Sequence, residues 1–125
     1  MIHYKTQVTD VGPEAFDLLD GGVLVLYADG APAALAEISV QHRELSPPSP
    51  QGPSVGSKLS IGSVQCEVCA VGSTAWAKVK DLGHVVVNFN GASVAQRPGE
   101  ICVFPVEQSV LRAQLEAHAT IELSD

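Results

Sequence analysis

Histidines are the side chains of this sequence best suited to chemistry near neutral pH, because imidazole can act there as a nucleophile, an acid, a base or a metal ligand. The chain has four of them: His3, His42, His84 and His118. No two are spaced four residues apart, as metal-binding histidines on one helix face would be, so each is judged by its own surroundings. Because His3 stands at the start of the chain and His118 in a polar helix end, we expect both to be solvated and without a chemical role.

His42 has the strongest local grounds for a function. It follows Ile38 and Val40 at two-residue spacing, which predicts that the three share one face of a strand. The prolines and glycines of residues 46–56 then stop regular structure, which places His42 at a strand end. Such a position can hold a reactive group in place while exposing it. A purely structural histidine is the alternative interpretation.

His84 is the second candidate. It begins the apolar run HVVVNF directly after Gly83. Glycine lets another backbone or a ligand approach closely. On the local pattern alone, a hydrogen-bonded histidine near the core is an equally good interpretation.

The three cysteines predict free thiols, because their number is odd and the N-terminus lacks the charged and apolar regions of a signal peptide. Cys66 and Cys69 have the CxxC spacing that can hold zinc or carry out dithiol exchange. This pair falls inside a predicted strand, however, where side chains three apart point to opposite faces. A zinc site formed by Cys66, Cys102 and His84 is kept as a weaker alternative.

Composition and missing motifs exclude several classes of function. Seven Lys and Arg against fourteen Asp and Glu give a net charge of -7, which disfavours nucleic acids and anionic membrane surfaces as partners. The sequence has no G-x-S-x-G element and no glycine-rich phosphate loop, so neither a serine hydrolase nor a nucleotide site is indicated. No apolar run is long enough to cross a bilayer. We therefore expect a cytoplasmic protein with no segment inserted in the membrane.

Short strands with brief helices between them predict a mostly antiparallel β-barrel or sandwich in a single domain. The expected strands cover 3–9, 22–27, 38–42, a hairpin over 58–71 with its turn at Gly62-Ser63, 84–90, 101–106 and an edge strand near 119–123. The expected helical segments cover 13–20, 31–38, 73–82 with Ser73 as N-cap, and 107–119.

Five stretches carry a family resemblance, and they occur in register along most of the chain. They are HYKTQVTDVGPEA at 3–15, GAPAALAEISVQH at 30–42, VGS at 71–73, LGHVVVNFNG at 82–91 and RPGEICV at 97–103. Together they resemble the glucitol/sorbitol-specific enzyme IIA component of the bacterial phosphoenolpyruvate-dependent sugar phosphotransferase system.

The resemblance implies one IIA domain over residues 1–125, folded as a small closed or nearly closed antiparallel β-barrel with a few short helices. It implies a phosphoryl carrier that accepts its group from the phosphocarrier protein HPr and passes it to a IIB component during glucitol/sorbitol uptake. An ungapped run back to Gly30 places His42 at the family's phosphorylated histidine. His84 would be the side chain that stabilises the phosphate. Positioning and hydrogen-bond donors suffice for this transfer, so no metal or other cofactor is expected.

Two departures from the family pattern follow His42. Glu44 occupies a same-face position where some members have a second histidine. Its carboxylate could orient the imidazole and raise its basicity, or it could repel an incoming phosphoryl group. Leu45 and the proline-rich loop replace a glycine of the family and change the expected docking surface. These departures motivate the alternative of a catalytically idle IIA-like domain that acts as a partner- or ligand-binding regulatory module.

Overall fold

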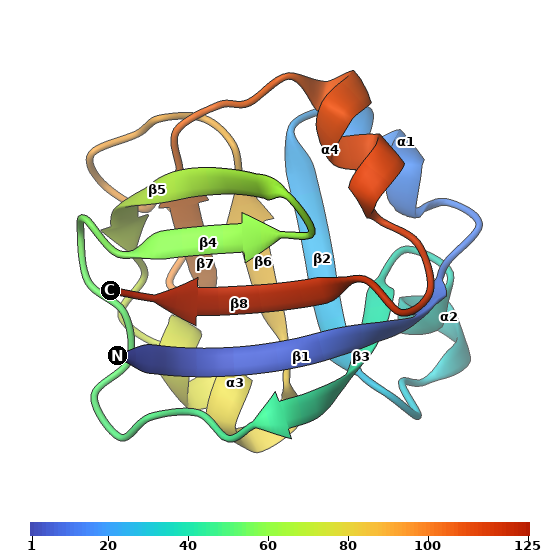
Figure 1. Cartoon of the computed structure of the whole chain (residues 1–125), viewed down its shortest axis with the longest axis horizontal. Helices are drawn as coiled ribbons and strands as arrows, with labels where there is room; N and C mark the ends of the chain where they lie inside the picture. Colours follow the sequence, from blue (N-terminus) through green and yellow to red (C-terminus); the bar gives the residue numbers. More distant parts are fainter.

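Eight β-strands form a closed barrel in the computed structural model, which describes residues 1–125 (Figure 1). The strands are β1 (Ile2–Val11), β2 (Val23–Ala28), β3 (Val40–Ser46), β4 (Lys58–Ile61), β5 (Val64–Val71), β6 (Val85–Asn88), β7 (Glu100–Val103) and β8 (Thr120–Ser124). Four short helices lie in the connections: α1 (Ala15–Asp20), α2 (Ala33–Ala36), α3 (Ala75–Leu82) and α4 (Gln108–Gln114). The predicted barrel is thus confirmed.

The strand order around the barrel is β1-β3-β2-β6-β7-β5-β4-β8, and β8 closes the ring by pairing with β1. Most neighbours are antiparallel, as predicted, and β4 and β5 form the expected hairpin around Gly62-Ser63. Two pairs, β2 with β3 and β6 with β7, are parallel instead. In both cases the connecting chain crosses from one end of the barrel to the other, through α2 or through residues 89–99, before the next strand begins.

Apolar side chains fill the barrel interior. The core cluster holds 23 buried residues, among them Leu59, Ile61, Val68 and Ile101. The space left inside, next to His42, amounts to about 10 Å³, which is at most one water molecule. The barrel is therefore a packed core rather than a ligand cavity, and any chemistry must take place at its surface or its ends.

Several element boundaries differ from the sequence prediction. Thr74, not Ser73, occupies the N-cap of α3, and it makes no side-chain cap hydrogen bond. Strand β7 ends at Val103, before Pro105, whose missing N–H cannot continue a strand ladder.

The C-terminal elements also differ from the prediction. Helix α4 stops at Gln114 because Leu115 leaves the helical conformation with φ -86° and ψ 80°. Strand β8 was expected at an edge but pairs with both β1 and β4, so it belongs to the closed ring.

His3 was expected to be solvated and is instead buried, with 4% of its surface exposed. The two chain ends lie side by side because β1 pairs with β8 (Figure 1). There the His3 ring is hydrogen-bonded through Nδ1 to Ser49 Oγ, 2.7 Å, and through Nε2 to Asp125 Oδ1, 2.8 Å. Ser57 Oγ also donates to the Asp125 carboxylate, at 2.9 Å. This terminal clasp of His3, Ser49, Ser57 and Asp125 ties the proline-rich loop to both terminal strands.

Candidate functional site

His42 lies near the start of β3, not at its end as predicted, because β3 continues to Ser46. Its side chain points into the barrel, on the same face as Val40, and is 1% exposed. Beyond it, Arg43, Glu44 and Leu45 are exposed, and β3 stays paired with β1 as far as Ser46 while its pairing with β2 ends at His42. The imidazole therefore closes one mouth of the barrel.

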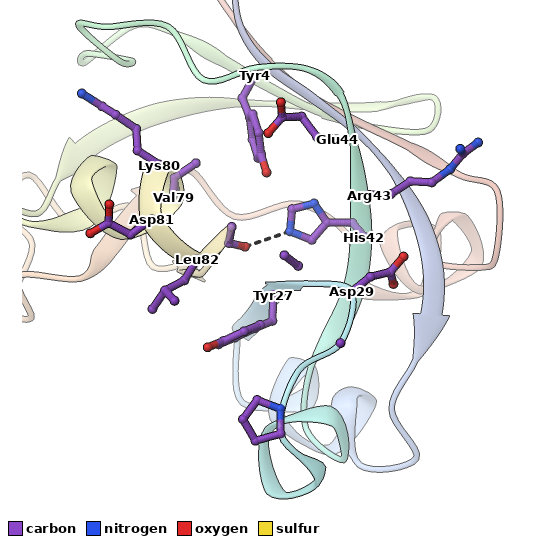
Figure 2. Close-up of a pocket in the computed structure, with 14 residues that line it drawn as sticks. Tyr4, Tyr27, Asp29, His42, Arg43, Glu44, Val79, Lys80, Asp81 and Leu82 are labelled. Atoms are coloured by element: carbon purple, nitrogen blue, oxygen red, sulfur yellow. Dashed lines mark hydrogen bonds between the residues drawn. The ribbon is translucent and has the colours of Figure 1, made fainter.

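A depression of about 510 Å³ opens above the imidazole (Figure 2). Strand β3, the end of β2 with the turn that follows it, and the last turn of α3 form its walls. The lining residues are Tyr4, Tyr27, Ala28, Asp29, Gly30, Pro32, His42, Arg43, Glu44, Val79, Lys80, Asp81, Leu82 and Gly83. His42 thus has the packed core on one side and a solvent-filled depression on the other.

One hydrogen bond fixes the imidazole. Nε2 of His42 lies 2.9 Å from the carbonyl oxygen of Gly83 (Figure 2). A carbonyl can only accept, so Nε2 carries the proton and donates, and Nδ1 retains a free lone pair. Nδ1 is buried and has no hydrogen-bond partner. Buried polar atoms without a partner are rare in proteins, and this one lies in a histidine that lines a depression.

The surroundings keep His42 neutral. Burial lowers the pKa of the imidazole below its ordinary 6.5, and the Gly83 hydrogen bond and the charge of Asp29 oppose this only in part. A neutral imidazole is the nucleophilic form. The imidazole is therefore neutral at pH 7 in this site.

Tyr4 supplies a hydroxyl group at the same mouth. Its ring packs edge-on against His42 with 5.9 Å between ring centroids. In Figure 2 the hydroxyl is turned toward the imidazole, with the Glu44 side chain beside it. Burial, and secondly the charge of Glu44, raise the pKa of Tyr4 to about 12. The phenol therefore stays protonated at neutral pH and can donate a hydrogen bond to an anion in the depression.

The cationic side chains of the depression are engaged away from the imidazole. Lys80 Nζ donates to the carbonyl of Pro50, 3.0 Å, and the Arg43 guanidinium donates to Gln7 Oε1, 2.6 Å. Figure 2 shows Arg43 directed away from His42, as expected for adjacent residues on a strand. In this arrangement the neutral Tyr4 hydroxyl, rather than a cation, is turned toward the imidazole and is our candidate donor for an anion.

Comparisons with known proteins identify the family of this chain. Residues 3–122 match the family described as the PTS system glucitol/sorbitol-specific IIA component. This chain belongs to that family. The glucitol/sorbitol-specific EIIA components of Escherichia coli (strain K12) and Shigella flexneri are each 35% identical to it over 100 residues, which is 80% of either chain. The predicted family is confirmed.

A solved structure also supports the fold of this IIA family member. The PTS system IIA component from Enterococcus faecalis V583 aligns with a TM-score of 0.71 and covers 97% of this chain and 99% of its own. Only 18% of the residues are identical, so this similarity speaks for the barrel alone.

His84 lies outside the depression that His42 lines. Its Nδ1 is 3.2 Å from the carbonyl oxygen of Leu26, and its ring packs against Tyr27 at 5.0 Å between centroids. It shares a separate depression of about 330 Å³ with Lys78 and Arg97. The two histidines singled out in the sequence are therefore not brought together at one cavity in this IIA chain.

The alternative of a zinc site is wrong. Cys66 points into the main core, whereas Cys69 and Cys102 belong to a small cluster outside it, as the strand geometry predicted. No group of three or more His, Cys, Asp and Glu side chains in the chain could hold a metal ion. All three thiols are free and buried. Burial raises the pKa of Cys66 and of Cys102 to about 11, which leaves both unreactive at neutral pH.

Sequence reasoning missed the contacts that Tyr4 and Gly83 make with His42. Both come from segments distant in sequence, and only the barrel topology brings them to β3. The alternation of Tyr4, Thr6 and Val8 signals an inward face of β1, but it contains no information on which strand lies beside it.

Proposed function

We propose that this protein is a phosphoryl carrier of the sugar phosphotransferase system. In this role His42 accepts a phosphoryl group from HPr and passes it to the IIB component of a glucitol/sorbitol-type permease. The observation that carries the proposal is the neutral His42 imidazole, which lines the depression and has one ring nitrogen without a partner. Membership of the glucitol/sorbitol-specific IIA family supports it.

Family membership also suggests where in the cell, and between which partners, the protein would act. Residues 1–125 would act as one IIA domain, in the cytoplasm, between HPr and the membrane permease. None of the helices is long and apolar enough to span a bilayer. The polyol itself would be bound by the permease and not by this chain.

The transfer step needs few groups from the protein. The ring nitrogen of His42 that carries no proton donates its lone pair to phosphorus and forms a P–N bond, while the bond between phosphorus and the donor breaks and its electron pair stays on the donor; the proton stays on the other ring nitrogen. The reverse exchange delivers the group to the IIB acceptor. Catalysis in such transfers rests on positioning and on donors to the phosphoryl oxygens. The Tyr4 hydroxyl is the side-chain donor that we assign to this task.

The resting arrangement does not yet permit attack. The imidazole is 1% exposed, Nδ1 is covered, and Nε2 is committed to the Gly83 carbonyl. Neither nitrogen can reach a phosphorus atom until the ring turns or the side chains around it move. We therefore propose that docking of HPr at the depression is coupled to a local rearrangement around His42. The phosphate-binding role predicted for His84 stays a prediction, which its position outside the depression does not support.

Labelling tests the proposal. Phosphoenolpyruvate, enzyme I and HPr should transfer one phosphoryl group to each wild-type chain and none to the His42→Asn variant. A His118→Asn variant, which removes an exposed imidazole elsewhere, is the matched control and should label like the wild type. Full labelling of folded His42→Asn protein would disprove the acceptor assignment.

The idle regulatory module remains the second candidate, and two observations favour it: the burial of His42 and the Glu44 carboxylate at the mouth of the depression. This alternative predicts that folded wild-type protein binds its own HPr without accepting the phosphoryl group. Binding can be followed by titration calorimetry with phosphorylated HPr, in parallel with the labelling assay.

A further inference from the structure

The Gly83–His84 peptide carries the carbonyl group that holds His42. Gly83 ends α3 in the left-handed conformation, with φ 61°, and its N–H donates to Val79 O at 2.9 Å. A Cβ atom at this position would lie 2.8 Å from Cβ of Ala28, so the glycine packs tightly against β2. This close approach turns the carbonyl oxygen of Gly83 toward the imidazole, 2.9 Å from Nε2.

The His84 side chain anchors the other side of the same peptide. Its Nδ1 lies 3.2 Å from Leu26 O and must be the donor, because a carbonyl only accepts. The backbone N–H of His84 makes only a long bond to Lys78 O, 3.4 Å. The imidazole therefore provides the shorter of the two hydrogen bonds that His84 makes.

Strand β2 is the common support for both histidines. It pairs in parallel with β3, where Ala28 stands opposite His42. It also carries Leu26, which accepts from His84, and Tyr27, whose ring contacts the His84 ring and lines the depression. A displacement of His84 from β2 would therefore move the Gly83 carbonyl relative to His42.

We infer that His84 is a positioning residue for His42. By donating to Leu26 it holds the Gly83–His84 peptide against β2, and so aims the Gly83 carbonyl at Nε2 of His42. The consequence is a single buried orientation of the His42 ring with its proton on Nε2. This role differs from a phosphate contact, and it holds whether the protein is an active carrier or an idle relative.

Two substitutions distinguish the effect of the His84 hydrogen bond from the effect of the size of its side chain. His84→Leu keeps an apolar side chain against Tyr27 but removes the donor. His84→Asn keeps a donor, because Nδ2 of asparagine stands in nearly the same place along the side chain as Nδ1 of histidine. His118→Asn controls for the loss of an exposed imidazole, and His84→Ala repeats the test if the leucine variant does not fold.

The first readout is the imidazole N–H of His42 in ¹H–¹⁵N NMR spectra. A buried N–H bonded to a carbonyl exchanges slowly with water and should be visible in the wild type, in His84→Asn and in His118→Asn. In His84→Leu the signal should disappear through fast exchange, while the amide signals of β4, β5 and β8 stay in place.

The second readout is the rate at which diethyl pyrocarbonate modifies His42, followed on the His42 peptide by mass spectrometry. Release of the ring should raise this rate about tenfold in His84→Leu and leave it unchanged in His84→Asn, since only an exposed neutral imidazole reacts readily.

Two results would overturn the inference. If the N–H signal and the modification rate in His84→Leu equal those of the wild type, the inference is wrong. It is also wrong if His84→Asn behaves like His84→Leu. Neither readout involves a phosphoryl group, so a failure of the proposed function would be seen separately, in the labelling assay.

Discussion

At the scale of single residues, the environment of His42 sets the protonation state that a phosphoryl donor meets. Burial favours the neutral ring, the Gly83 carbonyl fixes the proton on Nε2, and the Tyr4 phenol stays protonated beside it. A neutral nucleophile and a neutral donor are thus held next to each other at the barrel mouth. Both properties can be tested by titration and by substitution.

The lowered pKa of His42 predicts a loss of stability on acidification. The unfolded chain has the ordinary histidine pKa of about 6.5 and the folded chain a lower one, so the unfolded chain binds more protons between the two values. The contribution of neutral His42 is therefore complete above about pH 6.5 and is lost as the pH falls toward the folded pKa. Urea unfolding should show a larger drop in stability from pH 7 to pH 5 for the wild type than for His42→Asn. Equal drops would contradict the assigned pKa shift.

Glu44 should slow the transfer, because its carboxylate lines the depression that a dianionic phosphoryl group must enter. We expect Glu44→Gln to raise the initial labelling rate about threefold at low salt, with a smaller difference at high salt, where charges are screened. Glu116→Gln, which neutralises an exposed carboxylate that does not line the depression, is the control. A slower Glu44→Gln protein would instead show that the carboxylate orients or activates His42.

Residue roles were predictable where they depend on local pattern. The two-residue spacing of Val40 and His42 correctly predicted that they share one face, and the CxxC pair does point to opposite faces. The exposure expected of His42 was wrong, because the shared face is the inward one. The burial of His3 was not predictable, because its partners Ser49 and Asp125 lie 46 and 122 residues away in the chain. A pattern within ten residues contains no information on such partners.

At the scale of elements, the terminal clasp joins β1, β8 and the proline-rich loop through one buried and two partly buried hydrogen bonds. Loss of the His3 ring removes one of the two hydrogen bonds of the buried Ser49 hydroxyl, which keeps only the one from the Gly52 N–H at 3.2 Å. Leaving a buried polar group short of a partner typically costs about 1–3 kcal/mol. We expect His3→Ala to lower the free energy of unfolding by about that amount. Trp76 is the only tryptophan, it donates to Ser49 O at 2.7 Å, and its fluorescence in urea reports the change. A cost no larger than that of His118→Ala would show that the clasp contributes little.

The end of α3 gives a second prediction at this scale. Gly83 and Gly56 both have positive φ, 61° and 97°, but only at Gly83 would a Cβ atom meet a neighbour, Ala28. Backbone strain alone costs about 1–2 kcal/mol for a non-glycine residue. Gly83→Ala should therefore destabilise the protein by more than Gly56→Ala, measured by urea unfolding, and should also broaden the His42 N–H signal. Equal costs would mean that the packing against Ala28 relaxes freely.

Helices and strand pairings were predicted correctly where the residues that contact each other are close in the sequence. The β4–β5 hairpin follows from its Gly62-Ser63 turn, and α1 lies within the expected range 13–20. The parallel pairing of β2 with β3 and the inclusion of β8 in the closed ring depend on long-range pairing, so local periodicity could not reveal them.

At the scale of the whole molecule, barrel closure creates the site. Strand β1 pairs with β3 on one side and β8 on the other, which brings Tyr4 next to His42 and both chain ends to the clasp. The interior is packed, so the depression beside His42, at the point where the β2–β3 pairing ends, is the place at which we propose the chemistry occurs. The family resemblance, carried by five stretches in register, predicted the barrel and the acceptor position without this topology.

The most direct test of His42 as the acceptor is to locate the phosphoryl group on the labelled chain. Wild-type protein phosphorylated by phosphoenolpyruvate, enzyme I and HPr would be digested at alkaline pH, which preserves acid-labile phosphohistidine, and sequenced by tandem mass spectrometry. We expect one phosphoryl group, on His42, and no phosphorylated peptide from His42→Asn. A phosphoryl group on His3, His84 or His118, or on a residue other than histidine, would contradict it.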